Sequence, residues 1–257
     1  MKTNILLNKL AKKFPKRYAK DNHDFVGLMV GHKPEEVSKI ALVLDLDEIV
    51  FDRIKEAKPD IVITHHPFIY GYKSKVLKYD LMKKELYDKL EELNITVYSY
   101  HTNFDTGVDG MNDALANALG LKNIYTPDKD IMMRIGELDS DMEVHEFAKY
   151  ANRCLGVDYS LLINNGSSLI KKVGIIGGGG SRSYKIAQEE GCDIYISGDA
   201  PHHVRREIVT NNFNYLDMPH EIEHIFMPQM KKILLDIDST LEVITFDHEI
   251  IPEVIKD

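Results

Sequence analysis

The chain has 257 residues, of which 44% are hydrophobic and 28% charged, and its formal net charge is -9 at pH 7. This length and composition suit one large globular domain or two small ones. The acidic balance argues against unspecific binding to nucleic acids or membrane surfaces. No stretch approaches the roughly 18 apolar residues of a membrane span, and the two cysteines, Cys154 and Cys192, indicate no disulfide framework. The sequence therefore predicts a cytoplasmic protein.

The first fourteen residues contain the first predicted element. Apolar residues recur at Ile5, Leu6, Leu10 and Phe14, with lysines between them. This spacing predicts an amphipathic helix, and it lacks the uninterrupted apolar core of a signal peptide.

Strands and helices alternate along the rest of the chain. Helices are predicted at 48–57, 80–93 and 142–155, and strands at 38–45, 60–64, 95–100, 172–176, 193–197, 213–216 and 241–246. Alternation of this kind indicates βαβ units. The sequence therefore predicts an α/β protein with central sheets that are mostly parallel or mixed.

An internal repeat divides the chain. The segment from Lys39, KIALVLDLDEIVFDRIKEAKPDIVITHHP, aligns without gaps with the segment from Lys172, KVGIIGGGGSRSYKIAQEEGCDIYISGDA, at a constant offset of 133 residues. Each segment has the pattern strand, helix, strand and polar turn. We therefore expect a single domain made of two similar halves, at about 1–125 and 126–257.

Two consecutive histidines, His65 and His66, directly follow the strand predicted at 60–64, and Pro67 stiffens the turn after them. Adjacent residues on an extended chain point in opposite directions, so the two rings could serve two metal ions or two sides of one site. A His-His pair is more often a pair of surface or core histidines, so a ligand role depends on further donors nearby.

A second polar cluster, His101 to Asp105 (HTNFD), follows the strand predicted at 95–100. A carboxylate such as Asp105 can bridge two cations with its two oxygens, although capping a helix is an equal alternative for it. His101 could be a ligand or an outer-shell partner of a ligand.

A third cluster, DMPHEIEH at residues 217–224, follows a predicted strand of the second half. Positions three or four apart on a helix share a face, so His220 pairs with Glu223 or His224 and hardly with Glu221. For Glu223, the alternative role is a favourable charge at a helix N-terminus.

These three clusters together predict a metal site. Imidazole and carboxylate donors without thiolate suit Zn, Fe, Mn, Co or Ni. In open parallel sheets, ligands bind beyond the carboxyl ends of the strands, and the clusters follow strand ends in both halves of the repeat. The sequence predicts two divalent ions, which as a pair would lower the pKa of a bridging water.

Two further turns lie in the second half. The turn GDAPHH ends at His203, a candidate for substrate contact or proton transfer because imidazole titrates near neutral pH. The turn GGGGSR ends at Arg182, and it could bind an anion through its backbone N–H groups or be a plain tight turn.

The ordered motifs DNHDFVGLMVG, THHP, HTNFD, GIIGGGGSR and SGDAPHH, followed by a late His-Glu motif, resemble the Ngg-one-interacting-factor-three-like family. Its members are often named GTP cyclohydrolase 1 type 2 homologues. The resemblance implies the Nif-three-like fold of two interleaved halves and a ring-shaped homohexamer with two-metal sites. It places the metal ligands at His65, His66, Asp105, His220 and a nearby glutamate, taken as Glu223 with His224 as the alternative. The chain is too short for the additional middle domain of some members.

The function implied is that of a metal-dependent hydrolase. Its substrate would be a nucleotide or another phosphorylated small molecule, and His101 or His203 would move protons. The alternative is a non-enzymatic metal-binding scaffold or regulator that acts through protein partners.

Overall fold

A computed structural model of the chain describes residues 1–21 and 23–255, which divide into two compact units. The first unit comprises Met1–Gly110 and Phe226–Glu249, and the second comprises Met111–Ile225 and the segment from Ile250. The chain therefore leaves the first unit near residue 110 and returns to it at Phe226. Each unit holds one mixed β-sheet with helices packed on it, so the protein is an α/β protein with two mixed sheets.

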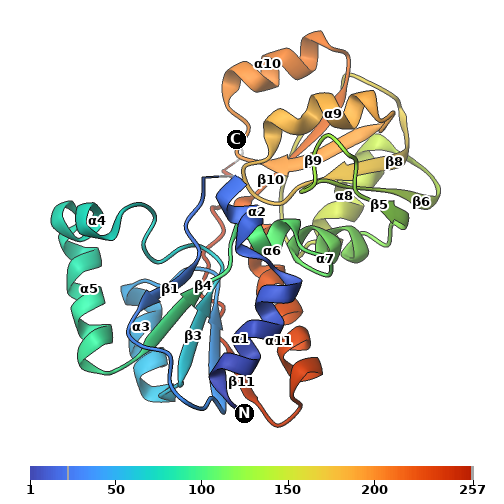
Figure 1. Cartoon of the computed structure of the whole chain (residues 1–257). Coiled ribbons are helices and arrows are strands. Elements are labelled where there is room, and N and C mark those ends of the chain that lie inside the picture. The colour runs from blue at the N-terminus through green and yellow to red at the C-terminus, as the bar shows by residue number, and fades with distance from the viewer. Residues whose placement is uncertain (22, 256–257) are drawn as a thin grey trace. The chain divides into compact units, whose positions relative to one another are not determined.

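The first unit is built on a five-stranded sheet in the order β1-β4-β3-β2-β11 (Figure 1). The strands β2, β3, β4 and β11 run parallel, and β1 pairs antiparallel with β4 at one edge. The strands are β1 (Gly27–Val30), β2 (Lys39–Val43), β3 (Ile61–Thr64), β4 (Thr96–Ser99) and β11 (Glu242–Thr245). The helices are α1 (Thr3–Lys13), α2 (Lys16–Asp21), α3 (Glu48–Ala57), α4 (Lys73–Tyr79), α5 (Leu81–Glu92), α6 (Thr102–Thr106) and α11 (Phe226–Ile237).

Both faces of this sheet are buried. Ala41 and Val62 belong to the apolar cluster that packs against α3 and α5. Their neighbours Ile40 and Ile63 point the other way, because side chains alternate along a strand, and they are fully buried as well. Figure 1 shows α1 and α11 on that other side of the sheet. Burial on two faces explains why β2 and β3 appear in the sequence as nearly continuous apolar runs.

The helix predicted at 48–57 is α3, and local capping explains its limits. The Asp47 carboxylate accepts hydrogen bonds from the N–H groups of Ile49 and Val50, at 2.9 and 3.2 Å, which is the usual arrangement at a helix start. Lys58 ends the helix in a left-handed conformation with φ of 50°. The first predicted helix is likewise confirmed as α1.

The second unit holds a six-stranded sheet in the order β5-β6-β8-β9-β10-β7. The strands β8, β9 and β10 are parallel, whereas β5, β6 and β7 pair antiparallel with their neighbours. The strands are β5 (Lys122–Tyr125), β6 (Arg134–Glu143), β7 (Leu161–Ile163), β8 (Leu169–Ile175), β9 (Ile194–Gly198) and β10 (Asn214–Met218). The helices are α7 (Met111–Ala118), α8 (Val144–Cys154), α9 (Tyr184–Glu189) and α10 (His202–Thr210), with 3-10 helices η1 (Ser181–Ser183) and η2 (His220–Ile225).

The core of the second unit lies on both faces of its sheet. Tyr195 and Tyr215 pack with residues of α9 and α10, including Ala187 and Val204. Helices α7 and α8 contact β6 and β8. In Figure 1 these two pairs of helices lie on opposite sides of the sheet.

The two sheets repeat the same strand register. Between β2 and β3, Ile40 pairs with Ile61, and between β8 and β9, Val173 pairs with Ile194. Both residues of the second pair follow those of the first by the 133-residue offset of the sequence repeat. The repeat therefore describes a real similarity of the two sheets.

Four antiparallel strands, β1, β5, β6 and β7, were not predicted. The second half of β6 is largely exposed and carries acidic residues, and most of β5 is exposed. Such exposed, polar stretches lack the apolar periodicity by which strands are recognised in a sequence. Within the described ranges, no helix is both long and apolar enough to cross a membrane.

Candidate metal centre

The end of β3 brings His65 and His66 to the carboxyl edge of the first sheet. Their backbone N–H groups donate to the carbonyls of Val43 and Leu44, at 3.2 and 3.0 Å, so the ladder with β2 continues past the strand. The chain then bends. The two rings do not point in opposite directions as on an extended strand, and their centroids lie 5.1 Å apart.

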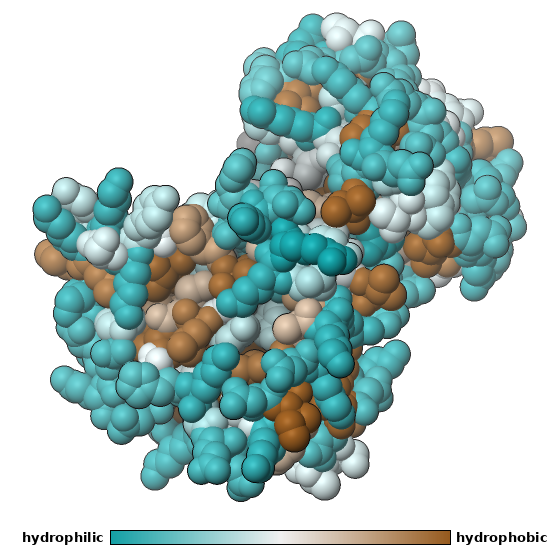
Figure 2. Space-filling view, in the orientation of Figure 1, coloured by the Kyte–Doolittle hydropathy of each residue, from teal (hydrophilic) through white to brown (hydrophobic). Residues whose placement is uncertain are grey.

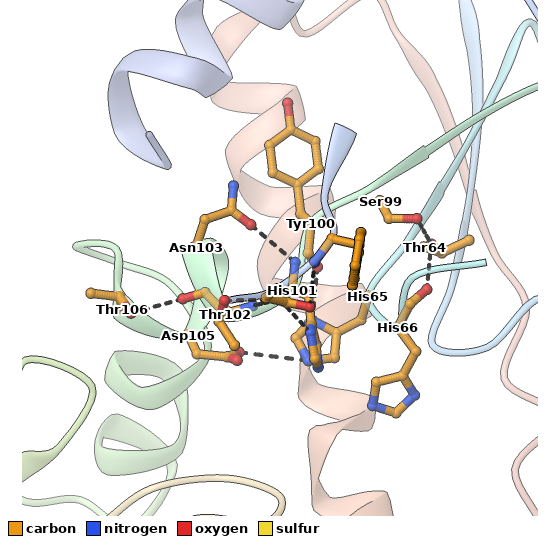
Figure 3. Close-up of polar contacts among 12 residues, drawn as sticks. Thr64, His65, His66, Ser99, Tyr100, His101, Thr102, Asn103, Asp105 and Thr106 are labelled. Atoms are coloured by element: carbon orange, nitrogen blue, oxygen red, sulfur yellow. Dashed lines mark hydrogen bonds and ion pairs between the residues drawn. The ribbon is translucent and has the colours of Figure 1, made fainter. Parts of the chain in front are cut away.

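His65 is fully buried. Its Nδ1 lies 3.0 Å from the carbonyl oxygen of Tyr100, and its Nε2 lies 3.6 Å from Asp105 Oδ1. Because a carbonyl oxygen can only accept, Nδ1 carries the proton and Nε2 presents a lone pair toward the carboxylate. Figure 3 shows this contact between His65 and Asp105.

The short helix α6 positions Asp105. The helix begins where the Asn103 side chain accepts a hydrogen bond from the N–H of His101 at 3.0 Å, and its amide donates to the carbonyl of Phe14 at 3.0 Å. The Asp105 side chain is only 8% exposed. A buried carboxylate on a fixed helix is a preorganised ligand for a cation.

His66 is held by a carboxylate that the sequence analysis did not single out. Its Nδ1 lies 2.7 Å from Asp45 Oδ2, on the segment that follows β2. The backbone carbonyl of His66 also accepts a hydrogen bond from the Thr64 hydroxyl at 2.8 Å. The backbone of His66 and the Nδ1 side of its ring are therefore both held, with Nε2 directed away from Asp45.

His101 is fixed in the same way by Asp24. Its Nδ1 lies 2.6 Å from Asp24 Oδ2, which also accepts a hydrogen bond from the Thr102 hydroxyl at 2.8 Å. Burial by itself raises the pKa of Asp24, but the hydrogen bonds from His101 and Thr102 outweigh it and hold this pKa below its ordinary value. Asp24 therefore stays ionised beside the imidazole.

Three histidines of the first unit form a cluster that could hold a metal ion. One ring nitrogen from each of His65, His66 and His101 lies within 4.8 Å of the others. The ring of His101 lies 5.1 Å from that of His65 and 5.6 Å from that of His66. His101 was predicted as a catalytic group, and this geometry also suits its alternative role as a ligand.

In the second unit, the segment after β10 brings His220 and Glu223 together. His220 Nε2 lies 3.1 Å from Glu223 Oε2, and its Nδ1 lies 2.5 Å from Asp199 Oδ2. The two residues belong to the 3-10 helix η2, in which side chains three positions apart lie above each other. Glu223 is buried, whereas the His220 side chain is 38% exposed.

The glycine turn after β8 lies against Glu223. Gly178 has φ of 58°, and a Cβ atom at this position would lie 2.4 Å from Glu223 Oε1. The Gly178 carbonyl accepts hydrogen bonds from the N–H of Gly198 at 2.7 Å and from the Ser197 hydroxyl at 2.9 Å. The turn is therefore closely packed, and the absence of a side chain at Gly178 leaves room for the Glu223 carboxylate.

The other candidates of the second unit lie elsewhere within it. The His224 ring lies against Gly156, whose Cβ position would be 3.1 Å from His224 Cε1. His203 is exposed on α10 and lines a cavity of about 280 Å³ together with Arg182, Tyr184 and Glu207. Neither His220 nor Glu223 lines that cavity.

One arrangement is common to four histidines of these two groups. In each of them a hydrogen-bond acceptor at Nδ1 fixes the ring. This leaves Nε2 as the ring atom that could bind a metal ion. The pairs are His65 with the Tyr100 carbonyl, His66 with Asp45, His101 with Asp24 and His220 with Asp199. The acceptors Asp24, Asp45 and Asp199 were not predicted, although each lies in a motif or directly after a strand.

The donor distances fit a divalent ion. Two atoms that each lie about 2.0–2.1 Å from one ion are separated by about 3.0 Å at a right angle and about 3.4 Å at the tetrahedral angle. The Nε2-to-carboxylate distances of 3.1 Å at His220 and 3.6 Å at His65 lie close to this range. A cation could thus be held between the imidazole and the carboxylate of each pair.

Comparison with known proteins gives a consistent match over nearly the whole chain. The family model described as Duf34/NIF3 (NGG1p interacting factor 3) matches residues 1–252. A GTP cyclohydrolase 1 type 2 homolog of Clostridium perfringens is 29% identical over 252 residues, which cover 95% of each chain. NGG1-interacting factor 3 of Saccharomyces cerevisiae is 25% identical over 224 residues, which cover 77% of each chain.

A solved structure has the same fold. The Bacillus cereus protein related to NIF3 superposes with a TM-score of 0.87 and covers 100% of this chain and 99% of its own. The sequence identity is 18%, so this likeness concerns the fold alone.

Proposed function

Because the chain belongs to the Duf34/NIF3 family, we propose that it binds two divalent metal ions and works as a metal-dependent hydrolase. The substrate class that we propose is a nucleotide or another phosphorylated small molecule. The name of the Clostridium perfringens relative, a GTP cyclohydrolase 1 type 2 homolog, supports this class.

The observation that carries the proposal is the common fixing of Nδ1 in four histidines. Acceptors lie 2.5 to 3.0 Å from these atoms, three of them carboxylates. Carboxylate–histidine pairs of this kind typically orient metal-ligating imidazoles and raise their basicity. Catalysis by a histidine alone does not require four rings fixed in one way, so metal binding explains the arrangement better.

The proposed ligands come from both units. His65, His66 and Asp105 are provided by the first unit, where His101 joins the cluster, and His220 and Glu223 by the second. The donor set of imidazoles and carboxylates suits Zn, Fe, Mn, Co or Ni. When bound, such ions act as Lewis acids and lower the pKa of a water molecule to near neutrality.

The residues around the ligands have supporting roles. Asp24, Asp45 and Asp199 hold the imidazoles in one tautomer and one orientation. His203, exposed beside Arg182, is the proposed residue for substrate contact or proton transfer. His101 would either move a proton or act as a further ligand, and its hydrogen bond to Asp24 suits both roles.

Metal analysis and an activity screen test the proposal. The protein is stripped of metal, reloaded with Mn, Fe or Zn, and assayed against nucleotides and phosphoesters. His65→Ala is expected to lose bound metal and turnover together, whereas His145→Ala, which changes an exposed histidine paired with Glu143, retains both. Unchanged metal content in His65→Ala contradicts the proposed site. A wild-type protein that is fully loaded with metal but turns over no substrate favours the scaffold alternative.

We also propose that the chain assembles as a homohexamer, which the family resemblance implies. The molar mass in solution would then be about six times the 29.4 kDa of the chain. Light scattering coupled to size-exclusion chromatography measures this directly, and a mass of one or two chains contradicts it.

A further inference from the structure

A second cavity lies in the first unit, and none of the proposed metal ligands lines it. Its volume is about 840 Å³, and it lies between α2, the start of β1 and the loop that leads into α4. Figure 2 shows a brown, apolar surface in this part of the unit, with teal side chains along its edges. The volume falls within the roughly 300–1,000 Å³ of small-molecule sites.

The edge of this cavity carries an excess of positive charge. Lys16, Arg17, Lys20 and Lys73 line it, and Asp24 is the only acidic residue among its described lining residues. The Asp24 carboxylate already accepts hydrogen bonds from His101 and Thr102. Because the whole chain has a net charge of -9, four cations around one cavity are a marked local exception. Clefts lined by one sign of charge concentrate ligands of the opposite sign.

The surroundings of Lys16 already disfavour its charge. Burial and repulsion from Lys33 lower the pKa of the Lys16 ammonium. Its Nζ lies close over Gly27, where a Cβ atom would be 2.4 Å away, and 5.7 Å from the Tyr98 ring. A bound anion would relieve this repulsion.

The remaining walls are apolar and aromatic. Val26, Leu28 and Ile69 provide aliphatic surface, and Leu28 is 43% exposed although it is apolar. The rings of Phe25 and Tyr72 meet edge to face with centroids 6.1 Å apart. Tyr72 is 71% exposed, with Lys75 Nζ 5.8 Å from its ring centroid. An exposed aromatic ring of this kind can stack against a flat ligand.

We propose that this cavity binds a flat aromatic molecule that carries several negative charges, with the chemistry of a nucleoside triphosphate. The phosphate groups would lie among Lys16, Arg17 and Lys20, and the base would stack on Tyr72 above the apolar wall. Lys73 adds positive charge at the edge, although its ammonium already donates to the Tyr87 hydroxyl. Arginine and lysine side chains bind phosphate oxygens through charge-assisted hydrogen bonds. Aromatic side chains bind bases of any kind by stacking.

The cavity adjoins the proposed metal ligands through Asp24. This residue lines the cavity, and its Oδ2 lies 2.6 Å from Nδ1 of His101. The further step, that the bound molecule is the substrate of the metal centre, rests on the proposed function. Binding in the cavity itself does not require a metal ion, and it can be tested without one.

The test is isothermal titration calorimetry of the full chain in low salt with EDTA. The probes are ATP and GTP, adenosine as the base without phosphate, and inorganic triphosphate as the charge without the base. Both nucleotides are expected to bind about tenfold or more tightly than either fragment, because only they use both the cations and the ring. Equal affinities for triphosphate and nucleotides, or no binding of either nucleotide, would overturn the proposal.

Matched variants locate the binding. The double variant Arg17→Ala/Lys20→Ala should weaken ATP binding about tenfold, and Tyr72→Ala should weaken it about tenfold while leaving triphosphate binding unchanged. The control Lys12→Ala/Lys122→Ala removes the same charge from exposed residues outside the cavity, and it should change the affinity less than twofold. Equal losses of ATP affinity in the two double variants contradict the assignment. A double variant at Arg17 and Lys20 that changes the molar mass in solution but not the ATP affinity contradicts it as well. Because EDTA is present, failure here leaves the metal-dependent activity to be judged by its own screen.

Discussion

Asp60 and Asp193 make the same two hydrogen bonds in the two sheets. The Asp60 Oδ2 atom accepts from the backbone N–H groups of Ser38 and Lys39, at 2.8 and 2.9 Å. The Asp193 Oδ2 atom accepts from those of Lys171 and Lys172, at 2.9 and 2.8 Å. Each carboxylate precedes the second strand of a βαβ unit and holds the start of the first strand.

We expect Asp60→Ala and Asp193→Ala each to lower the free energy of unfolding by about 1–2 kcal/mol, because two backbone donors lose a charged acceptor. Urea denaturation measures the change. Asp52→Ala, at an exposed position of α3, serves as the control and should change stability by less than about 0.5 kcal/mol. Equal losses at all three positions would show that the shared hydrogen bonds contribute little.

The stabilisation by Asp60 should depend on pH. Burial raises the pKa of Asp60, but hydrogen bonds from Ser38 and Lys39 outweigh it and lower this pKa below its ordinary value. Its contribution is therefore present above the unfolded pKa of about 3.9 and lost as pH falls through the folded pKa. The difference in stability between wild type and Asp60→Asn should shrink between pH 6 and pH 3, and a constant difference contradicts this.

Asp45→Asn should weaken metal binding by about 10- to 100-fold, because the His66 ring loses the carboxylate that lies 2.7 Å from its Nδ1. Competition with a fluorescent chelator measures the affinity. Asp47→Asn is a close control, because the Asp47 carboxylate lies two residues further along, where it caps α3 and pairs with His248 at 3.3 Å. It should alter stability slightly and leave the metal affinity unchanged; similar losses in both variants argue against an orienting role of Asp45.

Gly178→Ala should displace the Glu223 carboxylate. The added Cβ would lie 2.4 Å from Oε1, and the φ of 58° is unfavourable for alanine. We expect lower metal occupancy and a loss of roughly 1–2 kcal/mol in stability. Gly179→Ala is the matched control, since the nearest atom to its Cβ would be 3.8 Å away. Elemental analysis and thermal unfolding compare the two variants, and equal metal contents refute the effect on Glu223.

Glu223→Gln and His224→Gln distinguish the two candidates for the last ligand. The Glu223 carboxylate lies 3.1 Å from His220 Nε2, whereas the His224 ring lies against Gly156. We therefore expect Glu223→Gln to reduce the number of bound ions and His224→Gln to retain it. Inductively coupled plasma mass spectrometry of the two purified variants decides between them, and the opposite order would assign the ligand to His224.

Cys192 should be unreactive while the protein is folded. Burial raises the pKa of its thiol to about 12, so almost no thiolate, the reactive form, is present at pH 8. Unfolding returns the pKa to about 8.5. In a Cys154→Ser background, we expect labelling by iodoacetamide only after urea is added; fast labelling of the native protein contradicts the buried environment.

Because the folded pKa is raised, this thiol also stabilises the fold below about pH 8.5, and the contribution falls as pH rises toward 12.

Part of the fold could be predicted from single segments of the sequence. The helix at 48–57 and the strands after Ser38 and Asp60 follow from apolar periodicity and from the caps at their ends. The strand β6 could not be predicted, because its outer half pairs at the sheet through backbone hydrogen bonds while its side chains face solvent. A polar strand of this kind is specified by its neighbours in the sheet and not by its own residues.

The sequence by itself determined which residues could bind metal, since a strand end followed by His65, His66 or Asp105 is visible in the order of residues. It also determined the repeat, because a constant spacing needs no structure to be seen. Only the tertiary structure decided how the rings are held. Asp24 lies 77 positions from His101, and Asp45 lies 21 from His66. Such pairings arise when separate strands meet at one edge of a sheet, and a carboxylate that far away along the chain carries no local signal of its partner.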